Sequence, residues 1–355
     1  MEYRSLGKSD LKVSALSLGT MTFGEQCSKE EAFKILDYSI YAGVNLIDTA
    51  EMYPVYPCPE TCGISEEILG EYFSKRPRSS VLLATKIASC NPIGIGATKL
   101  SWIRSGGEHL KFDKKNINEA VIGSLKRLKT DYIDLYQLHW PERMVPMSDR
   151  LDYDSNSAHS GWTEFSDVLQ SLGELVKKGL IRYIGLSNET AWGLCKYLNT
   201  SAELDVPGPV CIQSAYNLIN RVFDIAHSEV TLMEQVGVLA YSPLAGGRLT
   251  GKYLNDARPD GARYSMWPGP HERYHNDRVN HAIYQYAKLA EKYNLSLSDM
   301  SYAFVMGRPY ISSVIIGCSN LMHVKNALSS LSAHLVPELL EELDNFHRIY
   351  PNPSV

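Results

Sequence analysis

The chain has 355 residues, of which 44% are hydrophobic and 21% are charged, a composition typical of a globular protein and unlike that of a disordered chain. Lys and Arg number 35 against 40 Asp and Glu, giving a formal net charge of −5, and no basic run is interleaved with aromatics, which argues against a nucleic-acid partner. The amino terminus is polar and no apolar stretch reaches the roughly 18 residues of a membrane span, so we expect a cytoplasmic protein without membrane contact, and no partner protein is predicted.

A β-hairpin is predicted at the start of the chain, within residues 1–15. Tyr3–Leu6 and Leu11–Val13 flank the turn sequence Gly7-Lys8-Ser9-Asp10, the arrangement expected of two short antiparallel strands.

Eight short apolar segments, separated by amphipathic ones, follow the hairpin. Continuous apolar runs of this length suit parallel strands that are buried on both faces. The segments are Leu16–Met21, Val44–Ala50, Val81–Ile87, Ile133–Trp140, Ile181–Asn188, Cys211–Asn217, Gly237–Ala245 and Ser313–Gly317. Eight such β/α units predict a (β/α)8 TIM barrel formed by residues 1–355 as a single domain, with the hairpin as a plug at its bottom and extra helices outside.

The intervening segments carry helix signals. Ser28 is placed to cap a helix over 28–42, which Gly43 ends, and Asp113 is placed to cap Lys114–Leu128. Further helices are expected in three places and a fourth helix is expected to open at Ser319. The three segments are Asp277–Tyr293, Leu297–Met306 and Pro337–Tyr350.

Four connections are longer than a barrel needs. They cover residues 51–65, 88–112, 141–163 and 244–275. All four follow the carboxyl ends of predicted strands, the face on which barrel enzymes carry their chemistry, so we expect the functional site there.

Seven cysteines are scattered along the chain without a zinc-ligand spacing. Reduced thiols in a reducing compartment are the favoured interpretation, and no metal site is predicted. Cys58 and Cys62 share a Pro-rich loop, where a redox pair is the lesser alternative.

Four polar residues follow the ends of three successive predicted strands: Asp48 and Tyr53, Lys86, and His139. Neighbouring strands lie about 4.8 Å apart, so these side chains can converge on one point. A phenol titrates near about 10, and a neighbouring ammonium is expected to lower that pKa, with Asp48 holding the ammonium in place.

Each residue alone has an ordinary interpretation. Asp48 could cap a strand end, Lys86 could form a Schiff base as in barrel aldolases, and His139 could be a satisfied core histidine. Their coincidence at successive strand ends favours an acid catalyst.

At this point the chain resembles the aldo/keto reductase family, and the resemblance covers nearly the whole sequence. The matching stretches are Leu18–Gly24, Asn45–Tyr53, Ala84–Lys86, Ser124–Trp140, Gly185–Asn188 and Tyr241–Leu244. The loop after Tyr53 is most similar to that of the Tas-like branch, and potassium-channel β-subunits are more distantly similar.

The resemblance implies that Tyr53 is the general acid, that Lys86 and Asp48 tune it, and that His139 orients the substrate carbonyl. All four positions are filled in this chain, whereas the channel β-subunits lack the histidine. This favours an active enzyme.

The resemblance also implies a dinucleotide site, with Ser187, Asn188 and Gln213 on the nicotinamide amide and Tyr241 stacked on its ring. NADPH (NADP+) is favoured over NADH because Ser319 and Arg263 are present, although His323 and Ala327 depart from the family pattern. The complete implied set is Thr20, Met21, Asp48, Ser187, Asn188, Gln213, Tyr241, Ser242, Pro243, Leu244, Ala245, Gly246, Leu249, Lys252, Arg263, Ile316, Gly317, Cys318, Ser319, His323 and Asn326.

Apolar and aromatic residues in the upper loops predict a pocket for a small carbonyl substrate. The residues assigned to it are Phe23, Met52, Tyr56, Trp140 and Trp162. Trp102 and Trp267 are expected only to pack loops together.

Three functions follow from these observations. The favoured one is an NAD(P)H-dependent reductase of aldehydes and ketones that transfers a hydride to the carbonyl. The second is a dinucleotide-sensing regulatory subunit with little turnover, and the third, a lysine-dependent lyase, has no need of Tyr53.

Overall fold

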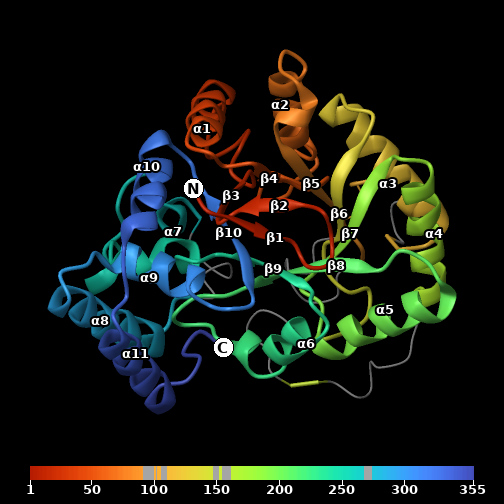
Figure 1. Ribbon diagram of the computed structural model, residues 1–355. Coiled ribbons are helices and arrows are strands. Elements are labelled where there is room, and N and C mark those ends of the chain that lie inside the picture. The colour runs from red at the N-terminus through yellow and green to blue at the C-terminus, as the bar shows by residue number, and fades with distance from the viewer. Residues whose placement is uncertain (91–99, 101, 105–109, 147–151, 154–160, 268–273) are drawn as a thin grey trace.

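Eight parallel strands close into a barrel in the computed structural model, which describes residues 1–90, 100, 102–104, 110–146, 152–153, 161–267 and 274–355 (Figure 1). Each expected strand is present. The strands are β3 (Leu16–Gly19), β4 (Leu46–Asp48), β5 (Leu82–Ile87), β6 (Ile133–Leu138), β7 (Ile181–Ser187), β8 (Pro209–Ala215), β9 (Gly237–Tyr241) and β10 (Ile311–Gly317). β10 pairs with β3 and closes the ring.

Side chains that alternate along each strand point to opposite faces, so one residue in two faces the barrel interior. The lower interior layer is apolar and contains Leu46, Ala84, Leu135, Cys211, Leu239 and Ile315. Two residues further along the strands, the same alternation places Asp48, Lys86, Gln137, Gln213 and Tyr241 in the layer above. Other apolar strand residues pack with the helices in the main core, among them Leu83, Tyr136 and Ile184.

The N-terminal hairpin plugs the barrel bottom, as expected. β1 (Tyr3–Ser5) and β2 (Lys12–Ser14) pair antiparallel, and Leu6, Leu11 and Val13 pack into the lower interior layer. Gly7 has a φ of +57°, and a Cβ there would lie 2.1 Å from the carbonyl oxygen of Val210. The turn therefore approaches the barrel too closely for any side chain.

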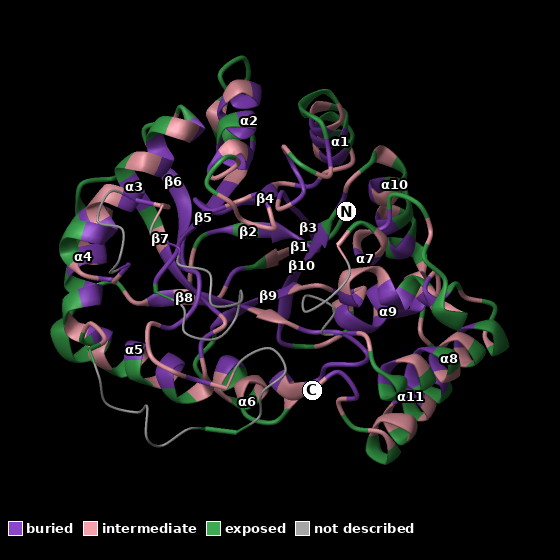
Figure 2. Ribbon diagram, turned by 180° about the vertical axis from the view of Figure 1, so that it is seen from behind, coloured by how far each residue is buried: buried purple, intermediate pink, exposed green. Residues whose placement is uncertain are grey.

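Helices surround the barrel, and Figure 2 shows their buried residues facing the strands and their exposed residues facing outward. They are α1 (Lys29–Tyr41), α2 (Ile64–Phe73), α3 (Lys114–Leu128), α4 (Phe165–Lys177), α5 (Ala191–Leu204), α6 (His227–Met233), α7 (Arg263–Met266), α8 (Asp277–Lys292), α9 (Leu297–Met306), α10 (Leu321–Ser329) and α11 (Pro337–Ile349).

The capping predictions are confirmed. The Ser28 side chain accepts a hydrogen bond from Glu31 N at the start of α1, and the Asp113 side chain accepts one from Asn116 N at the start of α3. Each cap satisfies a backbone N–H that has no partner within its helix.

One local expectation is wrong. The helix after β10 is capped by Asn320, whose side chain accepts from His323 N, and not by Ser319. Asn and Ser cap equally well, so the sequence does not distinguish them. Connection 244–275 contains the short helix α7.

Parts of three predicted upper connections, 88–112, 141–163 and 244–275, lie outside the described residues. In the described parts of the chain, no helix combines the length and apolar character needed to cross a bilayer.

Candidate active site

The upper interior layer is a connected polar network centred on Asp48 at the end of β4. Lys86 Nζ donates to Asp48 Oδ2 at 2.6 Å and to the carbonyl oxygen of Thr49 at 2.7 Å. The side-chain amides of Gln137 and Gln213 each donate to Asp48 Oδ1 at 2.9 Å. Both carboxylate oxygens are therefore bonded, as a buried charge requires.

Lys86 is fully buried, so its ammonium depends on these acceptors. Burial lowers the pKa of Lys86, and the Asp48 carboxylate counteracts part of that shift. The expected Asp48–Lys86 pair is present in the structure.

Tyr53 lies directly above this pair. The Lys86 ammonium is 4.9 Å from the centroid of the Tyr53 ring, and the His139 ring meets the Tyr53 ring edge to face with centroids 5.7 Å apart. The carbonyl oxygen of Tyr53 accepts from Gly63 N at 3.0 Å, which holds the loop after β4 closed. The four residues expected to converge thus do so.

His139 is buried among backbone and ring contacts. Its backbone N–H donates to the carbonyl oxygen of Ile87 at 3.0 Å, and its ring contacts the Trp140 ring at a tilt of 36°, with centroids 4.5 Å apart. Burial, together with the Lys86 charge, holds the pKa of His139 well below its usual range. Its buried Nδ1 has no hydrogen-bond partner among the described residues.

The expectation that an ammonium lowers the pKa of Tyr53 is not met. Burial raises the pKa of Tyr53, the Asp48 charge raises it further, and Arg263 opposes them. Desolvation of a phenolate outweighs the influence of the cations nearby. The Tyr53 hydroxyl is therefore held protonated.

The strand ends assigned to the nicotinamide are linked by hydrogen bonds to the segment that carries His139. Asn188 Nδ2 donates to the carbonyl oxygen of His139 at 2.9 Å and to Ser187 Oγ at 3.1 Å. The Tyr241 hydroxyl donates to Asn188 Oδ1 at 2.6 Å. Asn188, Ser242 and Ala245 all have a positive φ, between 48° and 55°, and such backbone gathers at functional sites.

Gln213, assigned to the nicotinamide amide, donates its side-chain N–H groups to Asp48 and to Gln137 Oε1, the latter at 3.1 Å. Sequence reasoning missed Gln137 altogether. The signal was available, since Gln137 follows the inward-facing Leu135 by two residues in β6.

Two cationic side chains and a histidine gather at the other end of the predicted dinucleotide site. The pKa of Lys252 is lowered by burial and by the charge of Arg263, and that of His323 is lowered by burial and by the charge of Lys252. His323 Nδ1 lies 3.3 Å from Ser319 Oγ, at the start of α10. Within the described residues, neither Lys252 nor Arg263 forms an ion pair with a carboxylate.

The other residues assigned to the cofactor lie around the barrel top or in the core beneath it. Thr20 Oγ1 donates to the carbonyl oxygen of Asp48 at 3.1 Å, and a Cβ on Gly317 would point into open space. The backbone of Met21 accepts from Val55 N at 2.9 Å. Four members belong to the main hydrophobic core: Ala245, Leu249, Ile316 and Cys318.

An apolar cluster surrounds Tyr53. It contains Ala50, Met52, Ala88, Leu100, Leu110 and Trp140, with Tyr53, Trp102 and Ile103 packed against it. Met52 and Trp140, both assigned to the substrate pocket, belong to this cluster beside Tyr53. Trp102, expected only to pack loops, contacts this same cluster.

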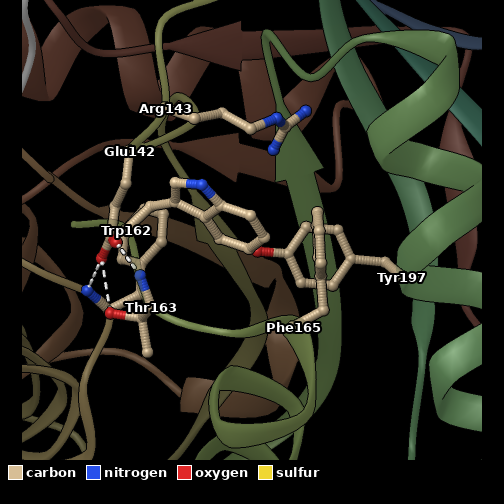
Figure 3. A pocket seen from close by; sticks show the side chains of 7 residues that line it. Glu142, Arg143, Trp162, Thr163, Phe165 and Tyr197 are labelled. Atoms are coloured by element: carbon tan, nitrogen blue, oxygen red, sulfur yellow. Dashed lines mark hydrogen bonds between the residues drawn. The ribbon is translucent and has the colours of Figure 1, made fainter. Parts of the chain in front are cut away.

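The remaining substrate assignments are distributed differently. Tyr56 meets Trp267 edge to face at 5.7 Å, so connections 51–65 and 244–275 touch. Phe23 lies in the main core. Trp162 packs on Phe165 with ring centroids 5.3 Å apart and lines a small pocket with Glu142 and Tyr197 (Figure 3).

The cysteines are free thiols, including Cys58 and Cys62. Cys58 Sγ lies 3.1 Å from Thr61 Oγ1, and Cys62 Sγ lies 3.5 Å from the carbonyl oxygen of Glu51. Over the described residues, no group of three or more His, Cys, Asp or Glu side chains is placed to bind a metal ion.

Comparison with known proteins gives matches over the whole barrel. A model of the aldo/keto reductase family matches residues 15–348. The chain is 40% identical to Protein tas of Escherichia coli (strain K12), with all of both chains covered. It is 29% identical to Uncharacterized oxidoreductase YrpG of Bacillus subtilis (strain 168), covering all of this chain and 97% of the relative. It is 28% identical to Probable voltage-gated potassium channel subunit beta of Arabidopsis thaliana, covering 97% of this chain and 96% of the relative.

Proposed function

Because the chain belongs to the aldo/keto reductase family, we propose that it reduces aldehydes or ketones by hydride transfer from NADPH, with Tyr53 as the proton donor. The observation that carries this proposal is the buried Asp48–Lys86 ion pair against the Tyr53 ring, with the His139 ring on that same tyrosine. Burying a charged pair in a barrel interior costs desolvation free energy. Its presence here therefore points to a function that retains it.

The chain's own residues have separate roles in this reaction. The Tyr53 hydroxyl, kept protonated by burial, donates its proton to the carbonyl oxygen as that oxygen becomes an alkoxide. Lys86, fixed by Asp48 and the Thr49 carbonyl, stabilises the phenolate that Tyr53 becomes. Neutral His139 orients the carbonyl, and the apolar cluster around Tyr53 excludes water.

The residues at the opposite side of the barrel fit a nicotinamide dinucleotide, which supplies the hydride when bound. The end of the site near α10 brings together Lys252, Arg263 and His323. The charges of Lys252 and Arg263 repel each other, so a bound anion would stabilise both, and the amino terminus of a helix also favours an anion. This arrangement suits the extra 2′-phosphate of NADPH and favours NADPH over NADH.

A dinucleotide-sensing subunit is the alternative, and it would bind the cofactor with little turnover. The chain retains His139 beside Tyr53, which favours catalysis. A cytoplasmic location and the absence of a partner protein stay predictions.

The cofactor proposal is tested by Lys252→Met, with Lys288→Met on the exposed face of α8 as the matched control. We expect Lys252→Met to weaken NADPH binding by about tenfold or more and to leave NADH binding within about twofold, because only NADPH carries the extra phosphate. Cofactor fluorescence measures both dissociation constants. Equal weakening for the two cofactors would mean that Lys252 does not contact the 2′-phosphate. Tight NADPH binding without turnover of any carbonyl compound would favour the dinucleotide-sensing subunit.

A further inference from the structure

Glu142 is a partly buried carboxyl group three residues after His139, outside the catalytic network. Figure 3 shows its side chain pointing toward Thr163, whereas Arg143 extends away from it. Its Oε2 accepts from Thr163 N at 2.6 Å, and its Oε1 accepts from Thr163 Oγ1 at 3.2 Å and also from Phe112 N. The Glu142 side chain therefore joins its own segment to those of Phe112 and Thr163.

Those segments are the ends of two long upper connections. Phe112 ends connection 88–112 immediately before Asp113, the cap of α3, and Thr163 ends connection 141–163 just before α4. Glu142 itself belongs to the segment that leaves β6 through His139. The carboxyl group thus fixes both connections relative to the catalytic histidine.

The first connection forms part of the wall around the proton donor. Leu100 and Leu110 lie in the apolar cluster with Met52 and Trp140, and Trp102 packs against it. Cys90 N donates to the carbonyl oxygen of Leu110 at 2.5 Å, which brings the two ends of the connection together. Ser89 and Trp140 exchange hydrogen bonds of 3.3 and 3.2 Å at the same place.

We propose that Glu142 is a positioning residue that shapes the substrate-binding region by fixing the apolar wall formed by Leu100, Trp102 and Leu110 against Tyr53. This rests on the proposed reductase function. The wall determines how bulky carbonyl compounds are held, whereas the reacting oxygen is held by Tyr53 and His139. Removal of Glu142 therefore weakens binding of bulky substrates selectively.

The test compares Glu142→Ala with Glu142→Gln, and with Glu164→Gln as a control on an exposed carboxyl group whose side chain caps nothing. For a bulky aromatic aldehyde, Glu142→Ala should raise KM about tenfold, the effect of losing about 1.4 kcal/mol of buried hydrogen bonding. For a short aliphatic aldehyde, kcat and KM should change by less than about twofold, and NADPH affinity should be unchanged, because this substrate does not reach the wall. Glu142→Gln should be intermediate, since one oxygen still accepts an N–H.

A second readout does not need turnover. Amide hydrogen exchange at Phe112 and Thr163 should accelerate in Glu142→Ala but not in Glu164→Gln, while exchange in the barrel strands stays unchanged. Unchanged exchange at both amides would overturn the fixing role. An equal rise in KM for the bulky and the short aldehyde would overturn the role in shaping the substrate-binding region. Absence of any turnover in the wild-type protein would instead contradict the proposed function.

Discussion

At the level of single residues, burial decides the direction in which the pKa of Tyr53 shifts. Tyr53 was expected to be a phenol with a lowered pKa because an ammonium lies nearby. The structure keeps that ammonium 4.9 Å from the ring centroid but pairs it with Asp48, so little net positive charge remains to favour a phenolate. Burial then prevails and raises the pKa of Tyr53.

This arrangement predicts an asymmetric pH dependence. Because the pKa of Tyr53 is raised, its proton should stay available, and carbonyl reduction should vary little between about pH 6 and about pH 9. His139, whose pKa is lowered, stays neutral over the same range. The reverse reaction needs the phenolate, so alcohol oxidation should become faster as pH rises. Rates of both directions measured with saturating cofactor provide the test.

A reduction rate that falls with an apparent pKa near neutrality would contradict this account. It would mean that the pKa of Tyr53 is lowered once the cofactor is bound, as the sequence alone suggested.

The convergence of the proposed catalytic residues was predictable because each one interrupts an apolar pattern. Asp48, Lys86 and His139 stand at strand ends where hydrophobic residues cost less. Gln137 was not recognised, because an uncharged amide within β6 attracts no notice until strand register shows that it shares a layer with Asp48. Gln137 and Gln213 share Asp48 as an acceptor only in the folded barrel, so no local sequence pattern reveals this contact.

At the level of elements, strand alternation and helix capping account for most of the fold. The eight strands were each predicted, and most of their boundaries differ by a few residues because backbone pairing ends before the apolar run does. For α3, the capping residue and both helix ends agree with prediction. The start of α10 was misplaced by one residue, since Ser319 and Asn320 are both good caps.

The hairpin plug gives a prediction at this level. Gly7→Ala should lower the free energy of unfolding by about 3 kcal/mol or more, because the new Cβ would meet the carbonyl oxygen of Val210 in addition to the cost of a positive φ. Gly179→Ala is the matched control, since Gly179 has a φ of +73° with nothing within 4 Å of its Cβ position. The control should lose only about 1 kcal/mol, the cost of the left-handed conformation.

Urea unfolding of both variants measures the difference. Equal losses in the two would mean that the hairpin can move away from the barrel, and that its close fit contributes nothing to stability.

At the level of the whole molecule, the site depends on contacts between segments far apart in sequence. Arg104 forms a buried ion pair with Glu51, and Arg143 pairs with Glu189 beside Asn188. These pairs attach the upper connections to the strand ends that carry the catalytic and cofactor residues. The sequence shows that the connections are long, but not which charges meet, because partners separated by tens of residues leave no local signal.

The comparison with relatives acts at this same level. The family match covers residues 15–348 and therefore the complete barrel. It does not identify the carbonyl compound, because substrates of barrel enzymes are chosen by their upper connections. The proposals for Glu142 and Lys252 concern those connections and can each fail without affecting the family assignment.

The central claim is that Tyr53 supplies the proton for carbonyl reduction, and the most direct measurement compares the wild-type protein with Tyr53→Phe. Loss of NADPH absorbance is followed with aromatic aldehydes, dicarbonyls and ketones, and NADPH affinity is measured by fluorescence. We predict turnover in the wild-type protein, a fall in kcat of about 100-fold or more in the variant, and nearly unchanged NADPH affinity, because only the proton is removed. Substantial residual turnover in Tyr53→Phe would show that the proton comes from another group.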